Sequence, residues 1–165
     1  MEFEQSLSLH ATSADVMAFV QGTIEGERNR VATLANISAI LNQYLSRINW
    51  VGFYLRAFGA TQLILGPFQG LVACTRLSIG EGVVGQAAVR GETLVVANVL
   101  EFPGHIACDS QSRSEIVVPI HSGGQVVAVL DVDAPELDRF HASEKNLLEA
   151  VGRLLGENWG LMTDF

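Results

Sequence analysis

A chain of 165 residues, 48% hydrophobic and 17% charged, is long enough for one domain with a real core and too apolar to be disordered. Its net charge of −8 argues against nucleic acid and anionic membranes as partners, because both require basic patches. No apolar run approaches the roughly 18 residues of a membrane helix, and Met1-Glu2-Phe3-Glu4 is acidic where a secretion signal would be basic. We therefore expect a single cytoplasmic domain over residues 1–165.

Two helices are predicted before the first strand. Thr12 to Asp15 can cap a short helix over 14–21, and the glycines at 22 and 26 are expected to interrupt it. A longer amphipathic helix is predicted from residue 28 to about 46, with a stripe that should cover a sheet. Its apolar residues recur at helical spacing: Val31, Leu34, Ile37, Leu41 and Leu45.

Apolar runs bounded by turn residues predict strands over 49–55, 61–65, 70–77, 93–96, 116–120 and 125–132. In the first strand, Trp50 and Tyr54 should face away from a continuously apolar core face. Gly66-Pro67 is expected to end the second strand, and the third should carry Cys74. Ser122-Gly123-Gly124 joins the last two as a hairpin.

The sequence G-E-G-V-V-G at 80–85 formally matches a dinucleotide-binding fingerprint before a helix over 83–90. That fingerprint belongs to a parallel βαβ unit, whereas hairpin-linked strands precede it here, so a tight strand-to-helix turn is favoured. A closing helix capped near Ser143 runs to about Trp159. This order of elements predicts an α+β domain, an antiparallel sheet with N- and C-terminal helices packed on it.

Cys108 lies in a long loop predicted over 98–114, in which Pro103-Gly104 marks a turn shortly before the cysteine. A loop of this length in a compact domain is usually functional. Two cysteines in a cytosolic chain favour catalytic or redox roles over a structural staple, although both could be small buried hydrophobes.

Three carboxylates are expected at one end of the sheet. Asp131 and Asp133 are two apart on an extended segment and face the same way, and Glu115 begins the strand paired with theirs. Crowded acids raise at least one pKa, which favours a bound ammonium group and can keep one carboxylic acid protonated for proton donation. The alternative is that all three are ordinary solvated or capping residues.

Two other site types have weaker support. A metal site of Cys108, His105 and the carboxylates lacks the C-x-x-C or H-x-x-x-H spacing of metal ligands. A cysteine protease triad with His105, His121 or His141 is also disfavoured, because His105 is only three residues from Cys108 on the same loop.

Several segments together resemble the GAF-domain free methionine-(R)-sulfoxide reductases. They are N-W-V-G-F-Y at 49–54, L-G-P-F-Q-G at 65–70, A-C-T-R at 73–76, G-E-G-V-V-G at 80–85, F-P-G-H-I-A-C-D at 102–109, S-E-I-V-V-P at 114–119 and L-D-V-D at 130–133. The resemblance runs from about Ile48 to the C-terminus, and F-P-G-H-I-A-C-D is its most specific part. It implies a GAF-like fold and reduction of free L-methionine (R)-S-oxide.

The resemblance also implies roles for individual residues. Cys108 matches the catalytic cysteine and Cys74 the resolving cysteine. The substrate pocket would be lined by three acids, two aromatic residues and loop backbone: Glu115, Asp131, Asp133, Trp50, Tyr54, Ile106 and Ala107, with Glu115 or Asp133 as the proton donor. Many members have a third cysteine where this chain has Val84, so the chemistry would run through two thiols alone.

The implied cycle uses no bound cofactor. Cys108 would become a sulfenic acid, Cys74 would condense with it to a disulfide, and thioredoxin would act as external reductant. Members of this family are often homodimers. The alternative is a non-catalytic GAF module that binds a small ligand or senses redox state, but such a module has no need of paired cysteines and a substrate pocket together.

Overall fold

The computed structural model describes residues 11–106 and 108–164. Its centre is an antiparallel six-stranded sheet in the order β3-β2-β1-β6-β5-β4. The strands are β1 (Trp50–Arg56), β2 (Gln62–Gly70), β3 (Arg76–Ser78), β4 (Leu94–Val96), β5 (Ser114–Ser122) and β6 (Gln125–Ala134).

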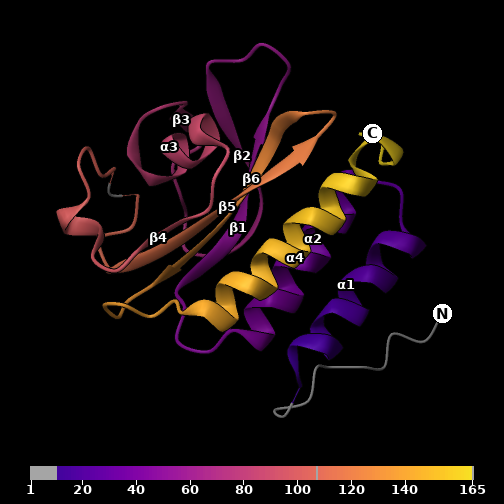
Figure 1. Cartoon of the computed structure of the whole chain (residues 1–165), viewed down its shortest axis with the longest axis horizontal. Helices are drawn as coiled ribbons and strands as arrows, with labels where there is room; N and C mark the ends of the chain where they lie inside the picture. The colour runs from indigo at the N-terminus through magenta and orange to yellow at the C-terminus, as the bar shows by residue number, and fades with distance from the viewer. Residues whose placement is uncertain (1–10, 107, 165) are drawn as a thin grey trace.

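The helices lie on both faces of this sheet (Figure 1). On one face are α1 (Ser13–Gly26), α2 (Arg30–Tyr44) and α4 (Ala142–Asn158), and α3 (Gly82–Arg90) is on the other; short 3-10 turns span Val99–Glu101 and Trp159–Leu161. This confirms the predicted α+β class with terminal helices on an antiparallel sheet. No helix in the described part of the chain is long and apolar enough to cross a membrane.

Two hydrophobic cores result, one on each face of the sheet. The larger core packs Val51 and Phe53 of β1 against the stripes of α1, α2 and α4. The smaller core packs Trp50 and Tyr54 of the same strand against α3 and the loops beside it. The predicted division of β1 into two faces is therefore confirmed, and both of its faces are covered.

The prediction that α1 stops at Gly22 is wrong. Val16, Val20 and Ile24 form one buried stripe that continues past the glycine, and an added Cβ at Gly22 would have no atom within 4 Å. A glycine on the solvent side of a helix weakens it by about 1 kcal/mol without ending it, and burial of the stripe outweighs that cost.

The prediction that Gly66-Pro67 ends the second strand is also wrong, since β2 continues to Gly70. Its pairing with β1 shifts between Gly52 and Tyr54, which places Gly66 and Pro67 in a bulge. On its other side β2 pairs with β3 only over Gln62–Ile64. A proline is tolerated there because its missing N–H leaves no ladder partner unpaired.

A third correction concerns the strand predicted over 70–77. Only Arg76–Ser78 is extended in the sheet, and Cys74 lies in the loop before it. Gly70 has φ +133°, a conformation that side-chain-bearing residues rarely adopt, so the chain turns away from β1 at that point.

The remaining predicted elements are present, with ends shifted by a few residues. The cap of α4 is His141, with Glu144 completing a capping box, rather than Ser143.

Candidate active site

A pocket opens on the α3 side of the sheet, beneath two loops, at the edge where β1 and β5 begin and β6 ends. It holds about 550 Å³ of space free of protein atoms, including solvent at its mouth. Its lining includes Trp50, Tyr54, Val72, Ala73, Leu77, Glu81, Val84, His105, Ile106, Cys108, Asp109, Ser112, Glu115, Asp131 and Asp133.

The aromatic wall belongs to β1 and β2. The rings of Trp50 and Tyr54 stack with centroids 5.9 Å apart, and Phe68 stacks on the other side of Trp50 at 5.3 Å. Gly52 leaves room for this stack, because an added Cβ there would lie 2.7 Å from Trp50 Cη2. The wall therefore depends on a glycine between its two aromatic residues.

Both aromatic residues also hold the loop that carries Cys74. Trp50 Nε1 donates to the Leu71 carbonyl at 3.2 Å, and the Tyr54 hydroxyl donates to the Cys74 carbonyl at 3.0 Å. Burial, together with the nearby carboxylates, raises the pKa of Tyr54, so this hydroxyl keeps its proton and remains a donor. The wall that faces the pocket thus also positions one of the two thiols.

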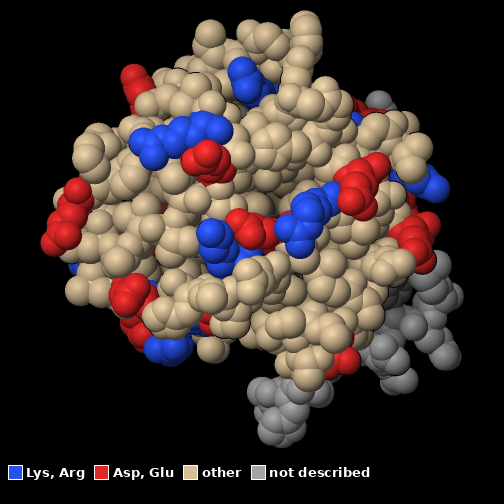
Figure 2. Space-filling model, viewed as in Figure 1, with Lys and Arg blue, Asp and Glu red and all other residues tan. Residues whose placement is uncertain are grey.

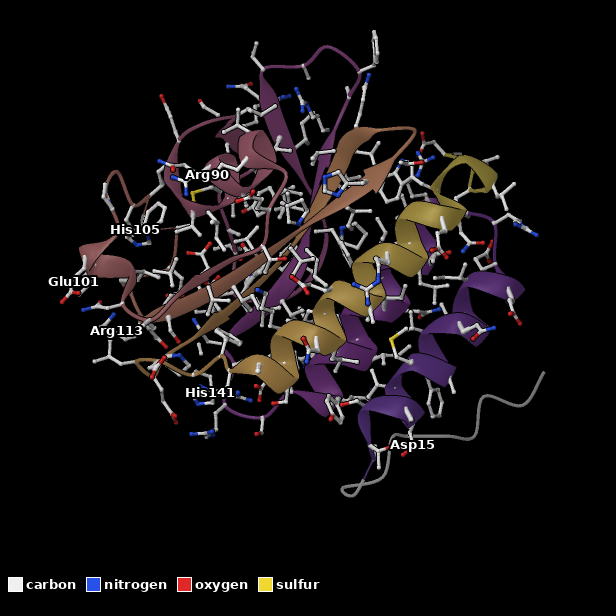
Figure 3. All side chains as sticks on the ribbon, viewed as in Figure 1. Asp15, Arg90, Glu101, His105, Arg113 and His141 are labelled. Atoms are coloured by element: carbon white, nitrogen blue, oxygen red, sulfur yellow. A yellow bond between two sulfur atoms is a disulfide. The ribbon has the colours of Figure 1, made fainter. Side chains whose placement is uncertain are left out.

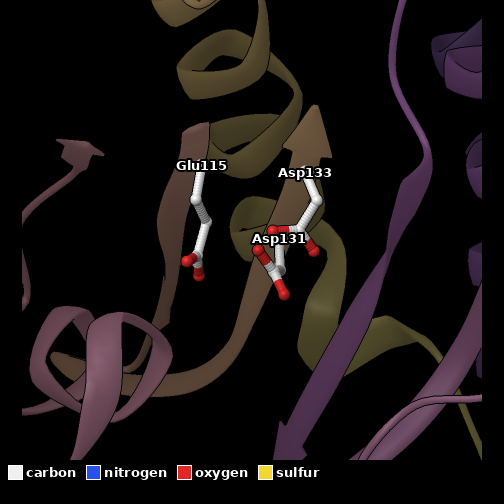
Figure 4. Close-up of side chains that lie close together, drawn as sticks. All are labelled: Glu115, Asp131 and Asp133. Atoms are coloured by element: carbon white, nitrogen blue, oxygen red, sulfur yellow. The ribbon is translucent and has the colours of Figure 1, made fainter. Parts of the chain in front are cut away.

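Three carboxyl groups meet at the floor of the pocket (Figure 4). Glu115 on β5 lies directly opposite Asp133 on β6, and Asp131 is two residues before Asp133 on the same face. One oxygen from each lies within 4.8 Å of the others. The sheet register therefore brings together the three acids that the sequence predicted, and they are also the described residues best placed to hold a metal ion.

Burial raises the pKa of all three acids. The pKa of Glu115 and of Asp131 is well above its ordinary value, first because of desolvation and then because of the charge on Asp133. Burial and the charge of Asp109 raise the pKa of Asp133 to about 7, and the Ser112 hydroxyl offsets part of this rise. All three acids therefore hold a proton more tightly than a free carboxyl group does.

Cys74 and Cys108 form a disulfide, with their Cα atoms 5.4 Å apart at a separation of 34 in sequence. Cys108 lines the pocket, and both residues pack against the smaller core. The bond joins the loop held by the aromatic wall to the long loop over 98–113. Two thiols at the mouth of an acidic pocket can exchange between dithiol and disulfide without a large rearrangement of either loop.

The other predicted site residues have mixed outcomes. Ile106 lines the pocket beside Cys108, whereas Ala107 lies outside the described residues. The Cys108 amide, expected to receive a substrate carboxylate, donates to the Ile106 carbonyl at 3.1 Å. Of the histidines, His105 lines the pocket, while His141 caps α4 (Figure 3).

Some pocket residues were not predicted. Asp109 and Ser112 face the acids from the long loop, and Glu81 and Val72 lie at the rim. Asp109 and Ser112 are polar residues within a few positions of Cys108, which is the only signal in the sequence that could have identified them.

Comparison with known proteins gives consistent results. Residues 29–158 match the GAF domain family. The chain is 43% identical to the free methionine-R-sulfoxide reductase of Escherichia coli, over 86% of this chain and 85% of the relative, and 38% identical to the Saccharomyces cerevisiae enzyme of the same name, over 96% and 91%. A free methionine-R-sulfoxide reductase from Neisseria meningitidis, solved in complex with its substrate, superposes with a TM-score of 0.86 at 38% identity, covering 94% of this chain and 96% of that one.

Proposed function

We propose that this chain, which belongs to the GAF domain family and within it to the free methionine-R-sulfoxide reductases, reduces free L-methionine (R)-S-oxide to L-methionine with Cys108 as its nucleophile. The observation that carries the proposal is the Cys74–Cys108 disulfide at a pocket floored by three acids, of which Glu115 and Asp131 are buried. A ligand-binding module requires neither a thiol pair nor a retained acidic proton.

The acids would select a free amino acid. Asp133, with a pKa of about 7, is the least buried of the three carboxyl groups and is the natural partner of the substrate's α-ammonium group. A methionine residue within a protein has no such ammonium. The stack of Trp50 and Tyr54 offers an apolar surface for the S-methyl end.

The chemical step is a thiolate attack on the sulfoxide sulfur. The S–O bond breaks, its oxygen is transferred to Cys108 as a sulfenic acid, and the sulfoxide is reduced to the thioether. A proton must reach the oxygen, and we expect Glu115 rather than Asp133 to donate it, because Glu115 shares its retained proton with Asp131.

Recycling would use Cys74. Its thiol condenses with the Cys108 sulfenic acid, which releases water and forms the disulfide present in the structure. A protein dithiol of the thioredoxin type then reduces this bond by exchange. No step in this cycle calls for a bound cofactor.

The proposal is tested by NADPH consumption with thioredoxin and thioredoxin reductase, comparing free (R) and (S) methionine sulfoxides. We expect turnover of the (R) form alone. Cys108→Ser should abolish turnover and leave methionine binding intact, because it removes only the nucleophile.

Cys74→Ser separates resolution from chemistry. The reduced variant should release about one methionine per protein, the stoichiometry of a single sulfenic acid, and then stall with thioredoxin. Sustained cycling of this variant at the wild-type rate would contradict the role of Cys74. Methionine binding without any turnover by the wild-type protein would instead favour a ligand-binding module.

A further inference from the structure

We propose that Asn49 is a positioning residue for the thiol chemistry: its side-chain amide holds the Cys108 loop against the end of the sheet. The amide nitrogen donates to Asp109 Oδ2 at 2.9 Å and to Ser112 Oγ at 3.1 Å. The link to catalysis rests on the proposed function. The hydrogen bonds of Asn49 and the measurement that tests their role do not depend on it.

The two bonds from Asn49 bracket the segment that follows Cys108. Asp109 is the next residue in the chain, and Ser112 is buried beside the acids. Asp109 also accepts from the Gln111 amide at 2.8 Å, so the same carboxylate fixes the turn and receives Asn49. Because an ionised carboxylate can only accept hydrogen bonds, the amide group must direct its nitrogen toward it.

Asn49 itself is firmly placed. It directly precedes β1, and its backbone N–H donates to the Asp133 carbonyl at 3.0 Å. The residue is therefore tied to β6 next to the acidic floor of the pocket. Its side chain reaches across to the loop that brings Cys108 over that floor.

The rest of this loop has little else to hold it. Among the described residues between His105 and Ser112, the hydrogen bonds stay within the loop, involve the adjacent Arg113 or reach Asn49, apart from the contact of the Ser112 hydroxyl with Asp133. Ile106 packs against Gly82, where an added Cβ would lie 3.3 Å away. When the disulfide is reduced, the Asn49 amide is thus the group from the sheet that holds the segment after Cys108 at two points, Asp109 and Ser112.

The amide oxygen of Asn49 also favours this role over a purely structural one. Asn49 Oδ1 is buried and has no hydrogen-bond partner among the described residues. A buried acceptor without a partner is unfavourable for folding, so an apolar side chain of the same shape would suit stability better. What an apolar residue cannot supply is the pair of donors to the loop.

The test is the reduction potential of the Cys74–Cys108 disulfide in the full chain, measured by equilibration with glutathione. Asn49→Leu keeps the branching of the side chain, at a larger volume, and removes the donors. The effective concentration of the two thiols should fall about tenfold, which raises the potential by about 30 mV, while the melting temperature stays the same or rises. Asn158→Leu is the matched control, because the Asn158 amide donates within α4, to the Leu154 carbonyl at 2.9 Å. The disulfide of this control variant should have the wild-type reduction potential.

Ser112→Ala provides a second, milder variant, which removes one of the two acceptors and should shift the potential in the same direction by about half as much. Steady-state kinetics add a further readout, in which Asn49→Leu should lower kcat and leave KM within about twofold, because the acidic floor that holds the ligand is intact. Wild-type potentials in the variants that fold, or an equal shift in Asn158→Leu, would overturn the proposal. If the wild-type protein does not reduce methionine sulfoxide, the proposed function fails, and the potentials still decide the role of Asn49.

Discussion

At the scale of single residues, the site is defined by carboxyl groups that lie where burial makes their charged form unfavourable. Glu115 and Asp131 are each 5% exposed, and Asp131 Oδ1 has no hydrogen-bond partner. Burying carboxyl groups without cations is unfavourable unless some of them stay protonated. The floor of the pocket is therefore prepared for a ligand that brings a positive charge and accepts a hydrogen bond.

This arrangement predicts how binding depends on pH. Asp133 must lose its proton to attract an ammonium group, and its pKa is about 7. The affinity of the reduced protein for free methionine should therefore rise between pH 6 and pH 8. In Asp133→Asn the rise should disappear, and binding at pH 8 should be at least about tenfold weaker, the size expected for a lost charged hydrogen bond. Titration calorimetry at several pH values measures both effects.

Glu149→Gln on α4 is the control for this experiment, because it changes the net charge equally at a position outside the pocket. It should retain the wild-type pH dependence. An Asp133→Asn variant whose affinity still rises tenfold over this range would mean that another group controls binding.

The residues of the site could be predicted to different extents. Asp131 and Asp133 followed from strand alternation, and Glu115 joined them because the hairpin fixes its register. The Cys74–Cys108 pairing came from a family resemblance, since spacing alone left each cysteine as a candidate buried hydrophobe. Asn49 was read only as the start of a strand, because nothing in the sequence shows that a loop 60 residues later returns to it.

At the scale of elements, β1 connects the core to the chemistry. Its alternate residues enter the two cores, so one strand both anchors the helices and presents the aromatic wall. Periodicity was sufficient to predict this division. It could not predict where β2 ends or where β3 begins, because the bulge opposite Gly52 and the tether from Trp50 to Leu71 depend on contacts between elements.

Gly52 is the position at which this strand is most sensitive. An added Cβ would overlap Phe68 Cβ and lie 2.7 Å from Trp50 Cη2, so Gly52→Ala should separate β1 from β2 and displace the aromatic stack. We expect a loss of more than ~2 kcal/mol in the free energy of unfolding, as for other overpacked core sites, measured by guanidinium denaturation.

Gly22→Ala is its counterpart in α1. The added methyl group meets no atom within 4 Å, so the variant should be more stable by about 0.5–1 kcal/mol, the helix preference of alanine over glycine. Equal losses in both variants would show that the close packing around Gly52 is not what requires a glycine there.

At the scale of the whole molecule, the two faces of the sheet have separate tasks. The face covered by α1, α2 and α4 holds the larger core, and the opposite face holds the pocket. On the side seen in Figure 2, basic and acidic side chains alternate, and pairs such as Arg139–Glu144 and Lys145–Glu149 lie along α4. Three acids, in contrast, lie together inside the pocket with raised pKa values, where they affect the stability of the entire domain.

Stability should therefore depend on pH in a direction set by the buried acids. The pKa of Asp133 is raised from 3.8 in the ordinary carboxyl to about 7, so the folded state holds this proton more tightly than the unfolded chain. The stabilisation is complete below pH 3.8 and is lost as the pH rises through 7. His105, whose pKa is lowered by burial, acts in the opposite direction, and Glu144, with a pKa of about 2, titrates below the range of interest.

Because one pKa unit corresponds to about 1.4 kcal/mol, we expect the disulfide form to lose more than ~2 kcal/mol of unfolding free energy between pH 5 and pH 8. The disulfide form is the one to measure, since its cysteines do not titrate. Glu115→Gln, a neutral side chain of the same shape, should reduce this loss and be more stable than the wild type at pH 8, because only two acids remain to repel each other. Denaturation curves at both pH values measure this loss, and a Glu115→Gln protein that loses as much stability as the wild type would show that Glu115 does not contribute to the cost of high pH.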